Sequence, residues 1–214
     1  MNVFFDLDGT LADTRADLAK AVNMTRRDCG LAEIPQERVV ECVGDGVRNL
    51  LARAIPERAG DVEALVPVQA RNYSTCRLDA TTLYPGVRET LQELSRRGWN
   101  LAVVTNKPEA DSAAILEGLG IARYFKALVA GGTTPHLKPS PETIRAAAAA
   151  MRSPPKRTDW MAGDNWTDLA AAAGAGIRAA YCTWGFGSAR DERYNISISS
   201  MRELLRYCPD REEY

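Results

Sequence analysis

The sequence predicts an α/β protein: a doubly wound parallel sheet with a Rossmann-like core and a small all-helical domain inserted after the first strand. Two observations lead to this fold class. From residue 84 onward, short apolar runs alternate with segments of helical spacing, which is typical of a parallel sheet with helices on both faces. Between about residues 14 and 82, apolar residues recur at helical spacing and no strand pattern is present.

The first strand is predicted at Val3-Phe4-Phe5. This run is apolar without interruption and stops at Asp6, as expected of a strand that is buried on both faces. The helical insert follows, with one stripe at Leu18, Val22, Thr25 and Cys29 and a second at Val39, Val40, Val43, Val47, Leu50 and Leu51. We therefore assign residues 1–13 and 83–214 to the α/β core and residues 14–82 to the helical domain.

The remaining core elements alternate along the chain. A helix is expected between Pro85 and Gly98, which are typical start and stop residues. Its apolar residues lie at i, i+4 and i+7: Val87, Leu91 and Leu94. Two helices rich in small residues are expected at 141–151, after the N-cap residue Ser140, and at 167–174. Further strands are expected at 101–105, 127–130, 160–162 and 179–182.

The overall composition argues against several classes of function. Hydrophobic residues make up 45% and charged residues 26% of the 214 residues, as in a soluble globular protein. The formal net charge of −1 gives no sign of a polyanionic partner such as nucleic acid. No signal-peptide pattern and no apolar run of membrane-spanning length is present, so we expect a cytoplasmic protein with no membrane partner.

The cysteines and the single histidine carry no motif. The cysteines show no CxxC or Cys/His spacing, which argues against a zinc site or a disulfide framework, and we expect reduced thiols. His136 is assigned no role, because a lone histidine is more often incidental than catalytic. The five cysteines are Cys29, Cys42, Cys76, Cys182 and Cys208.

Four short motifs follow predicted strands, at the edge where open parallel α/β sheets bind their ligands. The first contains Asp6 and Asp8 at alternate positions, so both are expected to point to the same side as the chain leaves the strand. Gly9 lets the backbone turn closely around them. A single aspartate here would more often cap a helix or a turn, but the complete string Phe5-Asp6-Leu7-Asp8-Gly9-Thr10-Leu11 favours a functional site.

The other three motifs are weaker when each is taken alone. Thr105 and Asn106 end a strand, where a hydroxyl can donate to a phosphoryl oxygen but where both residue types are also routine terminators. Lys138 is followed by prolines, which favour a fixed position over a mobile surface lysine. Asp164 and Asp168 straddle a helix start, where they either hold a metal ion or simply cap the helix.

Taken together and in this order, the motifs resemble those of the haloacid dehalogenase superfamily, most of whose members are phosphatases. The resemblance covers essentially the whole chain, and residues 14–82 are similar to the helical type-one cap of that superfamily. It implies a sheet with the first strand in the middle and all four motifs along one edge. Asp8, two residues after the nucleophile position, resembles the phosphatase and phosphomutase pattern rather than that of the dehalogenases or phosphonatases.

The resemblance also implies the catalytic roles. Asp6 would be the nucleophile that forms an aspartyl-phosphate, and Asp8 the general acid and base. Thr105, Lys138 and backbone N–H groups near Asp8 and Asn106 would bind the phosphoryl oxygens.

Mg²⁺ is the cofactor that the resemblance implies, since this hard cation binds oxygen ligands and substrate phosphate. Its ligands would be Asp6, Asp164 and the backbone carbonyl of Asp8. Asp168 is expected to orient water or Lys138, with direct ligation as the alternative.

The expected substrate is a small phosphorylated metabolite, bound partly by the helical cap. Gly44 and Gly46 predict a sharp loop between cap helices, from which Arg48 would donate to a substrate carboxylate; the alternative is an Arg48 side chain in solvent. The strings Tyr84-Pro85-Gly86-Val87, Thr105-Asn106-Lys107-Pro108 and Lys138-Pro139 are similar to the phosphoglycolate phosphatase subgroup, which implies a small acid such as 2-phosphoglycolate. A monomer or a homodimer is expected.

Three alternatives remain at this point. Phosphatases for pyrophosphate, sugar phosphates or nucleotides share the same motifs. A phosphosugar mutase of the β-phosphoglucomutase type would carry a histidine early in the cap, where this chain has Leu18. A non-catalytic binding protein would be expected to have lost an acid or the lysine, whereas Asp6, Asp8, Lys138 and Asp164 are all present.

Overall fold

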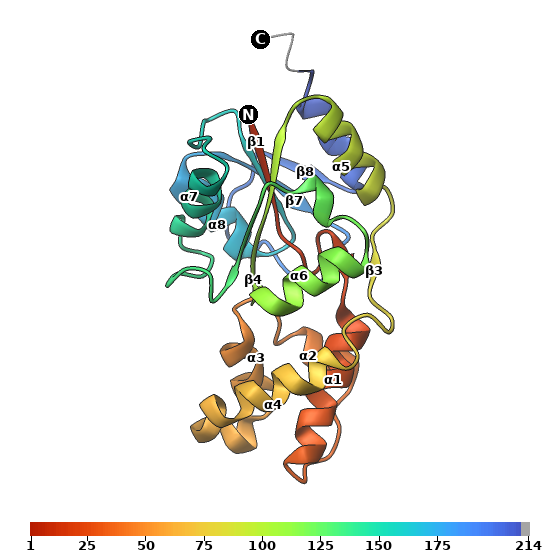
Figure 1. Ribbon diagram of the computed structural model, residues 1–214. Helices are drawn as coiled ribbons and strands as arrows, with labels where there is room; N and C mark the ends of the chain where they lie inside the picture. Colours follow the sequence, from red (N-terminus) through yellow and green to blue (C-terminus); the bar gives the residue numbers. More distant parts are fainter. Residues whose placement is uncertain (211–214) are drawn as a thin grey trace.

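The computed structural model describes residues 1–210 and contains a parallel sheet whose central strand is the first in the sequence (Figure 1). Every pair of neighbouring strands in it runs parallel. Across the sheet, the described strands are ordered β5 (Ala127–Gly131), β4 (Asn100–Pro108), β1 (Asn2–Phe5), β6 (Trp160–Gly163), β7 (Arg178–Cys182) and β8 (Ile196–Ile198). The predicted strands are therefore confirmed, and the short edge strand β8 is an addition.

Helices cover both faces of this sheet, as a doubly wound fold requires. One face carries α7 (Glu142–Ala150) and α8 (Trp166–Ala175); the other carries α5 (Val87–Arg96), α6 (Glu109–Gly118) and the 3₁₀ segment η3 (Met201–Tyr207). Successive side chains of β1 serve the two layers alternately. Phe4 packs in the cluster beneath α7 and α8, whereas Val3 and Phe5 belong to the cluster beneath α5 and α6.

Residues between β1 and α5 form a helical layer beyond the end of the sheet at which β4 terminates (Figure 1). Its helices share an apolar cluster that includes Val22, Leu51 and Leu65. They are α1 (Arg15–Asp28), α2 (Gln36–Val40), α3 (Val47–Ala54) and α4 (Val62–Ser74), with the 3₁₀ segment η1 (Pro56–Asp61) before α4. We refer to these helices as the cap.

The two chain segments that connect the sheet with the cap form hydrogen bonds with each other. β2 (Ala12–Asp13) and β3 (Thr82–Leu83) form a short antiparallel ladder, which the sequence pattern did not predict. Between α2 and α3 the chain makes the predicted loop, with Gly44 at φ +128° and Gly46 at φ +90°, backbone angles that favour glycine. None of the helices formed by residues 1–210 has the length and apolar character needed to cross a membrane.

Candidate active site

The four motifs meet at the carboxyl edge of neighbouring strands. Asp6 and Asp8 follow β1, Thr105 lies near the end of β4 and Asp164 follows β6, and these three strands are adjacent in the sheet. Lys138 reaches the same place from the loop after β5. The topology therefore brings together residues separated by more than 150 positions in the chain.

An acidic cluster forms the centre of this edge. Asp6, Asp164 and Asp168 are buried, and each offers a carboxylate oxygen within 4.8 Å of those of the other two. The Asp164 carboxylate accepts hydrogen bonds from the Thr10 hydroxyl at 3.2 Å and from the backbone N–H of Gly187 at 2.8 Å. Burial, reinforced by the neighbouring Asp6 and Asp168 carboxylates, raises the pKa of Asp164 to about 8.

Lys138 places one buried cation against this cluster. Its Nζ lies 2.8 Å from Asp6 Oδ1 and 2.6 Å from Asp168 Oδ1, and its side chain is 1% exposed. Burial alone would lower the pKa of Lys138, but the Asp168 and Asp6 carboxylates outweigh it and the pKa is raised. Asn106 fixes the lysine backbone, since its side-chain amide bonds both the N–H (2.8 Å) and the carbonyl oxygen (2.9 Å) of Lys138.

Asp168 contacts both the start of helix α8 and Lys138. Its Oδ2 accepts the backbone N–H of Asn165 at 3.0 Å, which completes a capping box at the start of α8. Its Oδ1 holds the Lys138 ammonium. Helix capping therefore sets the direction of the carboxylate that orients the lysine.

The acidic cluster fits a divalent cation that prefers oxygen ligands. Three buried carboxylates face a single ammonium, and such a surplus of buried negative charge is costly unless a further cation balances it. Asp6 Oδ1 is buried, and its one close polar neighbour within residues 1–210 is Lys138 Nζ, an ion-pair contact at 2.8 Å. Asp6 Oδ1 is thus an oxygen ligand suited to a metal ion.

Asp8 faces a lysine that the sequence analysis did not assign. Lys107 Nζ lies 3.0 and 3.1 Å from the two Asp8 oxygens, and the Thr14 hydroxyl donates to Asp8 Oδ1 at 2.7 Å. Lys107 Nζ also sits 4.4 Å from the centre of the Tyr73 ring. Burial would lower the pKa of Lys107, but the Asp8 carboxylate and the Tyr73 side chain raise it.

Strand alternation does not by itself place Lys107. β4 continues to Pro108 and includes both Thr105 and Lys107, but its pairing with β5 is irregular between Val104 and Pro108. The sequence pattern predicts a strand that ends at residue 105, which leaves Lys107 without an expected direction.

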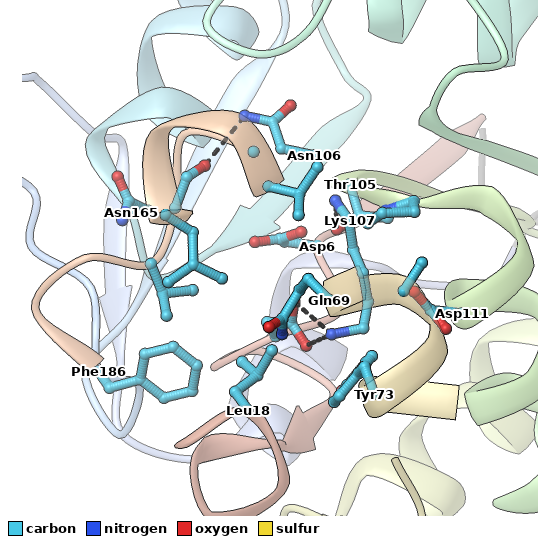
Figure 2. A pocket seen from close by; sticks show the side chains of 18 of the residues that line it. Asp6, Leu18, Gln69, Tyr73, Thr105, Asn106, Lys107, Asp111, Asn165 and Phe186 are labelled. Carbon is cyan, nitrogen blue, oxygen red and sulfur yellow. Dashed lines mark hydrogen bonds and ion pairs between the residues drawn. The ribbon is translucent and has the colours of Figure 1, made fainter. Parts of the chain in front are cut away.

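A cavity of about 160 Å³ separates the sheet edge from the cap (Figure 2). On the sheet side it exposes Asp6, Asp8, Thr105 and Asp164. The cap contributes two polar side chains, Gln69 and Tyr73, and a mainly apolar wall made of Leu18, Val43, Val47, Leu50, Val66 and Ala70. Gly46 and Asn106 also line the cavity, and the Asn106 amide donates to the carbonyl oxygen of Gly44 at 3.0 Å, which ties the cap loop to the sheet edge.

Arg48, the predicted cap ligand for a substrate carboxylate, lies outside this cavity. Helix α3 turns Val47 and Leu50 inward and Arg48 outward, where its guanidinium pairs with Glu63 of α4 at 2.6 Å. Both side chains of this pair are more than 60% exposed. The geometry thus corrects the sequence prediction: the solvent-exposed alternative describes Arg48.

The remaining residues considered from the sequence lie away from the chemistry. His136 is exposed, and its backbone contacts Thr134. All five cysteines are free thiols, and four of them are buried.

The fold agrees with comparisons to known proteins. The family model for haloacid dehalogenase-like hydrolases matches residues 3–182, and the chain belongs to that family. Within it the chain is a phosphatase similar to the phosphoglycolate phosphatase subgroup.

Curated relatives share about a third of their residues with this chain. A phosphoglycolate phosphatase of Pseudomonas fluorescens is 35% identical over 217 residues, covering 96% of this chain and 79% of the relative. One of Chromobacterium violaceum is 35% identical over 209 residues, covering 94% and 93%. The crystal structure of a predicted phosphoglycolate phosphatase from Haemophilus somnus superposes with a TM-score of 0.86 at 28% identity, covering 96% of each chain.

Proposed function

We propose that this phosphatase is a Mg²⁺-dependent phosphomonoester hydrolase that acts through an aspartyl-phosphate on a small phosphorylated acid such as 2-phosphoglycolate. The observation that carries the proposal is the approach of the Asp6 and Asp164 carboxylates to within 4.8 Å, next to Lys138 and two residues from Asp8. A single ion can be shared by two carboxylates at this separation. The names of the curated relatives support the substrate.

Mg²⁺ would be held by Asp6, Asp164 and the backbone carbonyl of Asp8. When bound, it supplies positive charge that lets an anionic carboxylate approach an anionic phosphate ester. Asp168, which is engaged with Lys138 and with the helix cap, would act on the ligands indirectly.

The first half-reaction transfers the phosphoryl group to Asp6. A carboxylate oxygen of Asp6 attacks phosphorus, and the bond from phosphorus to the ester oxygen breaks. Asp8 gives a proton to that departing oxygen, which leaves as an alcohol. This divides one difficult displacement into two easier ones.

The second half-reaction releases phosphate. Asp8, now ionised, accepts a proton from a water molecule that attacks the phosphorus of the aspartyl-phosphate, and the bond from phosphorus to Asp6 oxygen breaks. Inorganic phosphate and the Asp6 carboxylate are the products. Lys138, Thr105 and the backbone N–H of Asn106 would stabilise the charge on the phosphoryl oxygens in both steps.

The cavity favours a compact leaving group. Its volume of about 160 Å³ is below the ~300–1,000 Å³ typical of pockets for drug-sized ligands, which disfavours a nucleotide. Leu18 lines the cavity at the position where a mutase of the β-phosphoglucomutase type would present a histidine, which favours hydrolysis over isomerisation. A cytoplasmic location and a monomeric or dimeric state stay predictions.

Release of inorganic phosphate from a panel of esters tests the proposal. We expect 2-phosphoglycolate to be hydrolysed in the presence of Mg²⁺ and not after removal of divalent ions by a chelator. The panel should include pyrophosphate, sugar phosphates and nucleotides. Unchanged turnover in chelator, or isomerised sugar phosphate as the product, would contradict it.

A further inference from the structure

Lys107 is the positively charged side chain of the cavity lining, as far as residues 1–210 define it. Its side chain is 3% exposed, and its Nζ lies 3.0 Å from Asp8 Oδ1 and 4.4 Å from the centre of the Tyr73 ring. Figure 2 shows Lys107 beside Tyr73. Lys138, the other lysine of the site, contacts the nucleophile and Asp168 instead. The two lysines therefore contact different carboxylates of the site: Lys138 contacts Asp6 and Asp168, and Lys107 contacts Asp8.

The position of Asp8 fixes how far Lys107 lies from the leaving group. In the proposed reaction Asp8 donates to the ester oxygen, so that oxygen lies one hydrogen bond from the Asp8 carboxylate. Lys107 Nζ lies about one further hydrogen-bond length away, at 3.0 and 3.1 Å from the Asp8 oxygens. The ester oxygen is thus within about 6 Å of Nζ. A carboxylate joined to the ester oxygen through one carbon is short enough to lie in the space between that oxygen and Lys107 Nζ.

Two neutral side chains of the cap that can donate hydrogen bonds line the cavity on the side of Lys107. Gln69 and Tyr73 are four residues apart on α4, so they share one face of the helix. The Gln69 Oε1 already accepts the Thr25 hydroxyl at 2.7 Å, which leaves the amide nitrogen as the donor toward the cavity. The Tyr73 side chain is 3% exposed, and its hydroxyl has no hydrogen-bond partner in the described part of the chain.

The rest of the cap wall does not favour a sugar. Leu18, Val47, Leu50 and Val66 offer no partner to a row of hydroxyl groups, and buried hydroxyls without partners lower affinity. A short leaving group that carries one strong acceptor satisfies the lysine and the unpaired tyrosine hydroxyl together.

We propose that Lys107, assisted by Tyr73, binds the carboxylate of the substrate's leaving group, the role that the sequence assigned to Arg48. This inference rests on the proposed function and names its specificity determinant. The substrate class is a phosphate ester of a short 2-hydroxy acid, in which one carbon separates the ester oxygen from the carboxylate.

A matched pair of esters tests this assignment. 2-Phosphoglycolate and 2-hydroxyethyl phosphate differ in that a hydroxymethyl group replaces the carboxylate. The measured quantity is the ratio of their kcat/KM values, because any effect of Lys107 on Asp8 acts on both esters and cancels in the ratio. The wild-type protein should prefer 2-phosphoglycolate, and Lys107→Met should reduce that preference by about 100-fold.

Further variants separate charge from structure. Lys107→Arg should retain part of the preference, and Tyr73→Phe, which keeps the ring, should reduce it by about 10-fold. The matched control is Lys20→Met, which removes an exposed cap lysine paired with Asp79 and should leave the ratio unchanged. If Lys107→Met fails to fold, the wild-type ratio and the Tyr73→Phe ratio still decide the question.

Four results would overturn the assignment. A wild-type ratio near one contradicts it while leaving the proposed function in place. An unchanged ratio in folded Lys107→Met, or loss of the ratio in Arg48→Met instead, also contradicts it. A wild-type protein that hydrolyses neither ester in Mg²⁺ overturns the proposed function and this inference together.

Discussion

At the scale of single residues, two aspartates separated by one position have different surroundings and therefore different roles. Asp6 lies against the acidic cluster and Lys138, where a metal ion and a phosphoryl group can meet its carboxylate. Asp8 lies on the cap side, against Thr14 and Lys107, where it can reach a leaving group. Strand alternation points both residues to the same edge of the sheet. The residues that each of them contacts there determine its chemical role.

Replacing the nucleophile should abolish turnover. Asp6→Asn keeps the shape of the side chain but removes the attacking carboxylate, so we expect kcat to fall by ~10⁴ or more. The far-UV circular dichroism spectrum should match that of the wild type, which serves as the control for folding. Substantial steady-state phosphate release by this variant would remove the covalent mechanism.

Replacing the proton donor should slow both half-reactions without abolishing binding. Asp8→Asn cannot protonate the leaving oxygen or activate water, and we expect kcat to fall by ~10² to 10⁴. Rapid-quench kinetics would separate the phosphorylation of the protein from its dephosphorylation. Normal rates in both phases would contradict the acid–base role of Asp8.

The common location of the motif side chains was predictable from the sequence, because the ends of parallel strands lie along one edge of the sheet. Asp6, Asp164 and Lys138 come together for that reason. Lys107 and Arg48 were not predictable, since each depends on a detail that short-range spacing does not fix. For Lys107 the detail is the continuation of β4, and for Arg48 it is the rotation of α3 about its axis.

At the scale of elements, the central strands were predictable from the sequence pattern, whereas the short peripheral strands were not. β1, β4 and β6 are continuous buried runs that the sequence pattern identifies directly. β8 has three residues, and β2 and β3 have two residues each, so these strands carry too little pattern to be recognised. They exist because neighbouring chain segments pair with them, which is a tertiary effect.

A buried carboxylate fastens the segment through which the cap returns to the core. Asp17 of α1 is 1% exposed and accepts the backbone N–H groups of Ala80 and Thr81 at 2.8 to 3.1 Å. It also accepts the Thr81 hydroxyl at 2.7 Å. These contacts hold the end of the cap crossing against the start of α1.

Removing this anchor should destabilise the protein more than removing its surface neighbour. We expect Asp17→Ala to lower the free energy of unfolding by about 3 kcal/mol, because buried N–H donors lose a charged acceptor. Asp79→Ala, which breaks the exposed pair with Lys20, should change it by less than about 1 kcal/mol. Urea unfolding measures both, and equal effects of the two variants would contradict the anchoring role.

At the scale of the whole molecule, the acidic cluster couples stability to pH and to the metal ion. Asp164 has an ordinary pKa of 3.8, and burial beside Asp6 and Asp168 raises it to about 8 in the folded protein. Between these values the folded protein binds more protons than the unfolded chain. Its free energy of unfolding therefore falls as pH rises through this range when no metal is bound.

Thermal unfolding with and without Mg²⁺ measures this coupling. Because Mg²⁺ favours the ionised carboxylates, it should raise Tm more at about pH 9 than at about pH 6. Asp164→Asn removes one of the two carboxyls of the cluster whose pKa is raised, the other being Asp168, so this variant should lose part of the pH dependence and most of the Mg²⁺ effect. An equal Mg²⁺ effect at both pH values in the wild type would contradict the coupling.

The covalent state of Asp6 during turnover tests the central claim most directly. Wild-type protein mixed with 2-phosphoglycolate and Mg²⁺, quenched with acid within one turnover and digested, should yield a peptide containing Asp6 whose mass is increased by one phosphoryl group. The same peptide from Asp6→Asn should carry none. Turnover by the wild-type protein with no phosphoryl group detectable on that peptide, or with the group on another residue, would contradict the account.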